Sequence, residues 1–264
     1  GHRVYLDYLL TCGVCVHRAA GRPAFCVTGA MLGHHVDGGF AETITVSERN
    51  VVRLPESVPF EHGAIMMCSS ATALHALRRG RLCAGERVAI FGCGGLGVSA
   101  LQLARELGAA ELFAVDIADD KLALARALGA VAIDARVGDP VVAIRKATLG
   151  AGVDVTLDLV GRPDTTQAAV RVLAPQGRAV LVGLTGAKVT LDPYREILGP
   201  EAELIGSNDH TLPELLELIA FVERGRLDLS HAVTATVPLD AAAINGVLDA
   251  LEQGRAGVRT VVVP

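Results

Sequence analysis

The stretch that decides the fold is "VAIFGCGGLGVSALQLARELGAAELFAVD", residues 88–116. An aliphatic run leads into four glycines, a helical pattern follows, and a second aliphatic run ends at an aspartate. Gly92, Gly94 and Gly97 match G-x-G-x-x-G. In a strand–turn–helix unit the first glycine permits a tight turn, the second lets the main chain approach a pyrophosphate, and the third lets helix and strand pack closely. Because the helix N-terminus adds free N–H groups and a positive dipole, the stretch predicts a dinucleotide-binding turn.

The aspartate that ends the stretch, Asp116, lies nineteen residues after Gly97. A carboxylate at that point accepts hydrogen bonds from a ribose diol. It would also repel a 2′-phosphate, and the following residues, "IADDK", contain no arginine to bind one. The sequence therefore predicts NAD rather than NADP. Two alternatives stay open, a glycine turn without a ligand and a methyltransferase, although the spacing fits a dinucleotide better.

The rest of the chain predicts an α/β protein with a doubly wound parallel sheet of the Rossmann type. Aliphatic runs predict strands at 87–91, 112–115, 153–158 and 178–183, and helical patterns lie between and after them at 95–107, 119–128, 140–148 and 164–173. Residues 40–46 alternate apolar and polar, which predicts a half-exposed antiparallel strand. The tail predicts helices over 213–225 and 240–254 and a closing strand over 258–264.

Composition narrows the class of protein. Of the 264 residues, 51 % are hydrophobic and only 3 % aromatic, so the core must be mainly aliphatic, which suits buried parallel strands. A net charge of −5 without a basic block excludes a nucleic-acid surface. No apolar run reaches membrane-spanning length and no signal-peptide pattern is seen, so we expect a cytoplasmic protein without membrane partners. Three of the six cysteines crowd into residues 12–26, which in a reducing compartment favours metal over disulfide.

That cysteine-rich segment, "TCGVCVHRAAGRPAFC" at 11–26, resembles the structural-zinc lobe of the medium-chain, zinc-dependent alcohol dehydrogenases. The resemblance continues through "GHRV" at 1–4, "GGFAE" at 38–42, "GAIMMCSSATALHAL" at 63–77, "DLVG" at 158–161 and "RTVVV" at 259–263. It covers essentially the whole chain. It implies part of a GroES-like catalytic domain over 1–66, a Rossmann NAD-binding domain over 67–207, a return to the catalytic domain over 208–264, and assembly as a homodimer or homotetramer.

The resemblance also implies roles for single residues. It makes Cys68 a ligand of the catalytic zinc, places Thr72 and Leu96 beside the nicotinamide, and gives Gly183 the task of leaving room for the nicotinamide amide. It assigns Lys121 to the adenosine ribose, Arg259 to the pyrophosphate, and Gly95 to the cofactor turn together with Gly92, Gly94 and Gly97. Each residue also has a plain structural explanation: a buried thiol for Cys68, a hydroxyl bonded to its own helix for Thr72, and packing or solvated charge for the others.

Two departures from the family pattern matter. Cys12, Cys15 and Cys26 match zinc ligands of the lobe, but Arg18 takes the place of the third zinc cysteine, and a guanidinium has no lone pair to donate. We therefore expect three free thiols in a degenerate structural zinc site, with bound zinc as the alternative. In addition, the family carries a zinc-binding cysteine and a Gly-His-Glu motif before "GHRV", and this sequence has neither. We expect a fragment that lacks two ligands of the catalytic zinc.

The activity that the resemblance implies is hydride transfer between an alcohol or polyol and NAD. In that chemistry the zinc is a Lewis acid that lowers the pKa of the bound alcohol. Two alternatives remain: a zinc-independent reductase of enones or quinones that uses NADPH, and an NAD-binding module without turnover. The identity of the small-molecule alcohol, polyol or carbonyl substrate cannot be read from the sequence.

Overall fold

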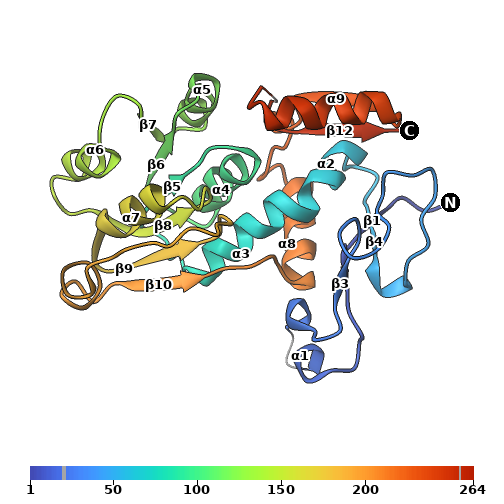
Figure 1. The fold of residues 1–264 in the computed structure, drawn as a ribbon, viewed down its shortest axis with the longest axis horizontal. Helices are drawn as coiled ribbons and strands as arrows, with labels where there is room; N and C mark the ends of the chain where they lie inside the picture. The colour runs from blue at the N-terminus through green and yellow to red at the C-terminus, as the bar shows by residue number, and fades with distance from the viewer. Residues whose placement is uncertain (20–21, 256) are drawn as a thin grey trace. The chain divides into compact units, whose positions relative to one another are not determined.

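The computed structural model describes residues 1–19, 22–255 and 257–264, and the chain in it forms two compact units. Unit 1 comprises Gly1–Ala71 and Asp209–Pro264, and unit 2 comprises Thr72–Asn208 (Figure 1). Gly21, part of the cysteine motif, lies outside the described residues. No helix in the described ranges is long and apolar enough to cross a membrane.

Unit 2 is built on a parallel sheet with the strand order β10-β9-β8-β5-β6-β7 (Figure 1). Its strands are β5 (Arg87–Phe91), β6 (Glu111–Asp116), β7 (Val131–Asp134), β8 (Val153–Asp158), β9 (Leu173–Leu181) and β10 (Glu203–Gly206). The helices are α3 (Ala71–Arg79), α4 (Gly95–Glu106), α5 (Asp119–Ala127), α6 (Pro140–Ala147) and α7 (Pro163–Arg171), with a π-helical turn, η4, at Pro193–Leu198. Read from β7 to β10, this is the Rossmann order, which confirms the predicted fold class.

The chain changes direction in this sheet between its two central strands. From β5 it proceeds outward through α4, β6, α5 and β7, and it then crosses back to β8 on the other side of β5. Right-handed crossovers running in opposite directions place helices on opposite faces of the sheet. The carboxyl ends of β5 and β8 meet at this switch point, where the N–H of Leu159 donates to the carbonyl of Phe91 at 3.0 Å. Open α/β sheets bind ligands at such a point.

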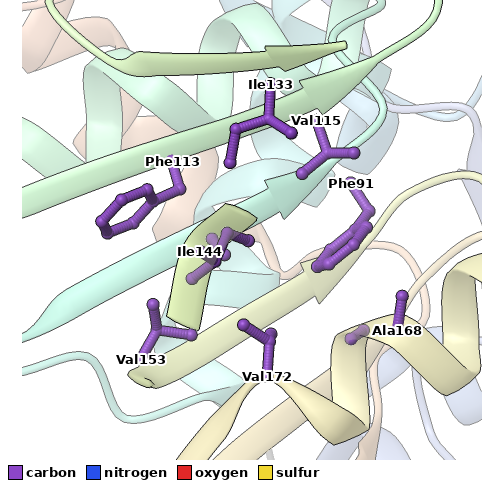
Figure 2. Close-up of a cluster of buried hydrophobic side chains, with 10 residues drawn as sticks. Phe91, Phe113, Val115, Ile133, Ile144, Val153, Ala168 and Val172 are labelled. Carbon is purple, nitrogen blue, oxygen red and sulfur yellow. The ribbon is translucent and has the colours of Figure 1, made fainter. Parts of the chain in front are cut away.

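The core of unit 2 is aliphatic with two phenylalanines. Phe91 and Phe113 lie against side chains of β6, β7 and β8 and of helices α6 and α7 (Figure 2). The cluster comprises Ala89, Phe91, Phe113, Val115, Ile133, Ile144, Val153, Ala168, Ala169 and Val172. Strands β5, β6 and β8 are buried along nearly their whole length, so they read in the sequence as continuous aliphatic runs.

Unit 1 consists of short strands in two-stranded sheets, with helices and helical turns. Strand β1 (Val4–Leu6) pairs antiparallel with β4 (Val51–Arg53), β2 (Leu9–Leu10) pairs antiparallel with β3 (Ala30–Met31), and β11 (Ala235–Pro238) pairs parallel with β12 (Thr260–Val263). The helices are α1 (Val16–Ala19), α2 (Phe60–Ile65), α8 (Leu212–Glu223) and α9 (Ala241–Glu252). Short helical turns, η1 at Pro23–Phe25, η2 at Glu48–Asn50 and the π-helical η3 at Met66–Ser70, complete the unit.

Two expectations from the sequence need correction. Residues 40–46 form no strand, although Ile44 and Val46 are half-buried and Thr43 and Thr45 are exposed, as the alternation predicted. A strand needs a hydrogen-bonding neighbour, and none of the described strands pairs with this segment. Strand β7 was not predicted. It has only four residues and Val131 is exposed, so it lacks the long buried aliphatic run that marks the central strands.

Candidate functional site

The glycine turn follows β5 and opens α4. Gly92 has φ of +96°, a conformation that glycine adopts without strain, and a Cβ on Gly97 would lie 2.1 Å from the carbonyl oxygen of Gly92. These two glycines are therefore required by the tight turn and by the close packing of helix on strand. A Cβ on Gly94 would meet no atom within 4 Å, so its main chain is open to a ligand. Gly95 and the half-buried Leu96 begin α4, whose first N–H groups have no partners within the helix.

Asp116 ties the glycine turn to the end of β6. Its Oδ2 accepts a hydrogen bond from the N–H of Cys93 at 2.6 Å, and its Oδ1 accepts from Ile117 at 2.7 Å and Ala118 at 3.0 Å. A carboxylate oxygen has more than one lone pair, so these bonds leave acceptor capacity for a ribose hydroxyl. The structure thus brings the two motifs of the 88–116 stretch together at one edge of the sheet.

A thiol and an ammonium lie at the same edge. Burial raises the pKa of Cys93 to about 12; the charge of Asp116 adds to this effect, and the charge of Lys121 opposes it. Lys121, in the first turn of α5, is therefore near enough to the glycine turn to act on it electrostatically. With this pKa the Cys93 thiol stays protonated near neutral pH, so it adds no charge to a phosphate site.

No sequence motif singles out Arg136, which the fold brings close to the end of β6. The residue before it, Ala135, donates its N–H to the carbonyl of Asp116 at 3.0 Å. The Arg136 guanidinium binds Asp134 through Nε at 2.9 Å and Nη2 at 2.6 Å, and it also pairs with Asp119. These bonds lower the pKa of Asp134 to about 2. No local motif marks this arginine, because β6, β7 and α5 meet only in the folded sheet.

A second loop of unit 2 approaches the same edge at the switch point. The buried carboxylate of Asp158, at the end of β8, accepts hydrogen bonds from the N–H groups of Val160 and Gly161 and from the hydroxyls of Thr165 and Thr166. The structure gives Gly183, which follows β9, a different explanation from the predicted one. A Cβ there would lie 2.2 Å from the nitrogen of Gly161, so its glycine is needed for close packing of two loops.

The predicted zinc ligand Cys68 lies in η3 of unit 1 and lines a cavity. Its side chain is exposed, yet the surrounding protein removes enough hydration to raise the pKa of the thiol, and the positive charge of Arg259 opposes this shift. The Tyr8 hydroxyl also lies beside this thiol and donates to Oδ1 of Asp209 at 2.7 Å. Thr72 is buried near the start of α3, which continues from η3.

Two residues before α8 complete this polar cluster. Asp209 has φ of +63°, which turns the chain just ahead of the capping box of α8. His210 is 2 % exposed, and its Nδ1 lies 2.5 Å from Oδ1 of Asp209. Its Nε2 has no hydrogen-bond partner in the described part of the chain. Burial, and then the hydrogen bond to Asp209, raise the pKa of Tyr8.

The residues present do not complete a catalytic zinc site. Such a site needs about three protein ligands and an open position. Within residues 1–19, 22–255 and 257–264, the one group of three or more candidate ligands comprises Cys12, Cys15 and Cys26, so Cys68 belongs to no such set. Cys68 alone does not supply the ligand set that a catalytic zinc needs.

The cavity beside Cys68 is a large apolar hollow within unit 1, with a volume of about 1950 Å³. It lies between the segment 36–47 and the strand β12 with helix α9. Its apolar lining includes Leu10, Leu32, Val36, Phe40, Ile44, Val46, Leu248, Leu251 and Val261. Phe40 is 67 % exposed, so this face of the unit presents a large aromatic side chain to solvent.

The predicted structural zinc lobe holds three thiols. The sulfur atoms of Cys12, Cys15 and Cys26 all lie within 4.8 Å of one another, and no fourth candidate ligand joins them in the described ranges. Arg18 lies in α1. The N–H of Cys12 and the hydroxyl of Thr28 lie against Cys26 Sγ and lower the pKa of this thiol to about 6. Three thiols do not satisfy the tetrahedral coordination of structural zinc, so these residues do not form a closed zinc site.

Comparison with known proteins gives a consistent result along the chain. Residues 1–56 match the family model described as the alcohol dehydrogenase GroES-like domain, and residues 95–223 match that described as zinc-binding dehydrogenase. An alcohol dehydrogenase of Geobacillus stearothermophilus is 31 % identical over 263 residues, which are 99 % of this chain and 76 % of the relative. An NAD-dependent alcohol dehydrogenase of Sulfolobus acidocaldarius is 30 % identical over 98 % of this chain and 74 % of the relative.

Comparison with solved structures gives the same result as the sequence comparison. The alcohol dehydrogenase of the archaeon Aeropyrum pernix superimposes with a TM-score of 0.90 at 34 % identity, over 100 % of this chain and 76 % of that one. A zinc-binding dehydrogenase of Sinorhizobium meliloti, solved with NADP, gives a TM-score of 0.90 at 30 % identity, over 100 % of this chain and 77 % of that one. The chain therefore belongs to the medium-chain, zinc-type alcohol dehydrogenase family of oxidoreductases.

Proposed function

We propose that this chain binds NAD at the glycine turn of unit 2 and serves in hydride transfer between an alcohol and that cofactor. The observation that supports this most is the position of Asp116, whose carboxylate ends β6 and accepts the Cys93 N–H of the glycine turn at 2.6 Å. An acid held against a glycine-rich turn is the arrangement that recognises a ribose diol next to a pyrophosphate. When bound, NAD supplies the carbon that accepts or releases the hydride.

In this proposal each residue of the turn has a defined task. The open main chain at Gly94 and the N-terminus of α4 at Gly95 receive the pyrophosphate, because free N–H groups and the helix dipole attract anions. Asp116 accepts the ribose hydroxyls, and Lys121 adds a nearby positive charge. For Leu96, Thr72, Gly183 and Arg259, the contacts with cofactor that the resemblance implies remain proposals.

The preference for NAD over NADP rests on charge. The Asp116 carboxylate would repel a 2′-phosphate, and the guanidinium of Arg136, two residues after the strand partner of Asp116, is already held by Asp134 and Asp119. An arginine that pairs with two carboxylates has little free capacity for a further anion. Since the Sinorhizobium meliloti relative was solved with NADP, the preference needs a direct test in this chain.

Binding of NADH, followed by fluorescence, tests the cofactor site. Asp116→Asn keeps an oxygen that can accept backbone N–H groups but removes the charge. Because a hydrogen bond to a charged group contributes about 1.5–3 kcal/mol, we expect roughly tenfold or greater weakening of NADH binding. The matched control is Asp154→Asn, since Asp154 accepts the N–H of Arg87 at 2.8 Å at the opposite end of the strands. Equal NADH affinity for the Asp116 variant, the control and the parent chain would refute the proposal.

The alternative of an NAD-binding module without turnover has its own support, because Cys68 belongs to no set of three candidate ligands among the described residues. Alcohol-dependent formation of NADH, measured with added zinc and then with chelator, separates the candidates. Turnover that the chelator abolishes supports zinc-dependent oxidation. NADH binding without turnover supports the module, and chelator-resistant reduction of an enone or quinone with NADPH supports the zinc-independent reductase.

Assembly as a homodimer or homotetramer also remains a proposal from the resemblance. Strand β10 is the last strand on its side of the described sheet, so its outer edge is available for pairing with a second copy. Sedimentation of the purified chain would give the oligomeric state directly.

A further inference from the structure

The three thiols of unit 1 are held together by the backbone around them. Strands β2 and β3 pair through Leu10 and Ala30, which brings residues just after β2 next to residues just before β3. The N–H of Gly29 donates to the carbonyl of Cys26 at 3.0 Å. The N–H of Cys12 points at Cys26 Sγ at 3.4 Å, so the sulfur of one cysteine lies against the main chain of the other.

The side chains continue this contact. The thiols of Cys12 and Cys26 are hydrogen-bonded to each other, and the Cys15 thiol is hydrogen-bonded to that of Cys12. All three sulfurs lie within 4.8 Å of one another, and all three residues are only partly buried. Sulfurs within 4.8 Å of each other, and a Cys12 N–H that lies 3.4 Å from Cys26 Sγ, place these two cysteines within reach of a disulfide.

The same cluster lacks what a structural zinc site requires. Zinc in such a site takes four nitrogen or sulfur ligands in a closed tetrahedron, and the described part of the chain offers three. All three cysteines are only partly buried, so an oxidant in solution can reach them. Thiols that are close together, accessible and without a metal are the arrangement found in redox-responsive sites.

We propose that Cys12, Cys15 and Cys26 form a hydroperoxide-responsive thiol site in which Cys26 and Cys12 are oxidised to a disulfide. The sulfur of Cys26 attacks the O–O bond of the hydroperoxide, which gives a sulfenic acid on Cys26 and releases water, or an alcohol from an organic peroxide. The sulfur of Cys12 then attacks the sulfenic sulfur, the S–S bond forms, and a second oxygen leaves as water. Two thiols lose two electrons and two protons in total, and the O–O bond takes up both. Cys15, next to Cys12, is positioned for exchange with the new disulfide.

Oxidation of the full chain by hydrogen peroxide tests this site. After treatment, free thiols are alkylated and the protein is weighed and digested with trypsin. Cys12 and Cys15 fall in the peptide 4–18 and Cys26 in the peptide 19–49, because Arg22 precedes a proline. We expect the oxidised chain to carry two alkyl groups fewer than the untreated chain, and a disulfide that links the two peptides. Dithiothreitol should restore both thiols.

Variants identify the pair. Cys26→Ser and Cys12→Ser should each abolish the 12–26 link, whereas Cys15→Ser should retain it. Cys83→Ser is the matched control, because Cys83 is an exposed cysteine of unit 2, and it should change nothing. These readouts do not depend on cofactor binding or turnover, so the thiol site and the proposed function can fail separately.

Three results would overturn the inference. The first is one zinc ion per chain, measured by elemental analysis, that protects all three thiols from alkylation until a chelator is added. The second is a Cys12–Cys15 disulfide within the peptide 4–18. The third is oxidation of Cys83 while Cys12, Cys15 and Cys26 stay fully alkylated.

Discussion

Asp134 and Arg136 show at the scale of single residues how the fold perturbs a charge. The guanidinium binds the carboxylate through two nitrogens, and the pKa of Asp134 falls to about 2 from its ordinary value of 3.8. A folded-state pKa below the unfolded value means that the folded chain holds this proton less tightly than the unfolded chain. The pair therefore stabilises the fold at pH values above about 4, and this contribution is lost as the pH falls through about 2.

The test compares Asp134→Asn with the parent chain across pH. We expect the variant to have a lower urea midpoint near neutral pH, because the ion pair is lost, and the gap in midpoint to close between about pH 4 and pH 2. Arg136→Gln should show the same narrowing of the gap at low pH, with an additional loss from its pair with Asp119. The double variant should lose little more than Arg136→Gln alone, since both changes remove the Asp134–Arg136 pair. A gap that stays constant down to pH 2 would show that Asp134 stabilises the fold by some means other than this ion pair.

At the scale of elements, the turn between β5 and α4 must both pack a helix on a strand and leave main chain open to a ligand. Gly97 packs against the Gly92 carbonyl, whereas Gly94 faces open space, so two positions of one motif hold glycine for different physical reasons. A helix must lie close to its preceding strand for the sheet to be covered, and a ligand must reach the main chain for the turn to bind it. Asp158 acts similarly on the neighbouring loop, where its side chain accepts from two main-chain N–H groups.

Alanine at these two positions separates folding from binding. Gly97→Ala should lower the free energy of unfolding by about 1–3 kcal/mol, because its methyl group would overlap main-chain atoms that cannot move far. Gly94→Ala should change stability by less than about 0.5 kcal/mol, since no atom is displaced. If Gly94 receives the pyrophosphate, Gly94→Ala should nevertheless weaken NADH binding. Chemical denaturation and NADH titration of both variants give the answer, and a Gly94 variant that binds NADH normally contradicts the assignment.

The large apolar cavity of unit 1 is the feature that matters at the scale of the molecule. It measures about 1950 Å³ and includes the exposed ring of Phe40. Extended exposed apolar surface attracts apolar ligands and other protein surfaces. This cavity is thus the place where we expect hydrophobic dyes to bind and copies of the chain to associate.

Dye fluorescence tests this expectation. Anilinonaphthalene sulfonate should bind the folded chain, and Phe40→Ser should reduce the fluorescence gain without lowering the unfolding midpoint, because the removed ring is mostly exposed. Val137→Ser is the control, since Val137 of unit 2 is 85 % exposed and does not line the cavity. Equal dye binding by all three chains, or none by the parent, would show that the cavity is not an accessible apolar site.

Comparison of sequence and structure shows which features were local. The helix α4, the strand β8 and the glycine turn could be predicted, because each depends on residues adjacent in the chain. The absence of a strand over 40–46 could not, because strand formation depends on a partner that may come from anywhere. Gly183 matched a family position, yet its close neighbour, Gly161, is visible only in the fold.

By itself, the sequence determined the class of sheet, the position of its glycine turn and the acid that accompanies it. Periodicity, turn residues and strand–helix alternation are short-range properties, and 88–116 contains all three. Only the tertiary structure decided that Arg136 would lie beside Asp116, that Tyr8, Asp209 and His210 would gather near Cys68, and that three thiols would come within 4.8 Å. Contacts between residues far apart in the chain depend on how strands pair and helices pack, and no local pattern encodes that.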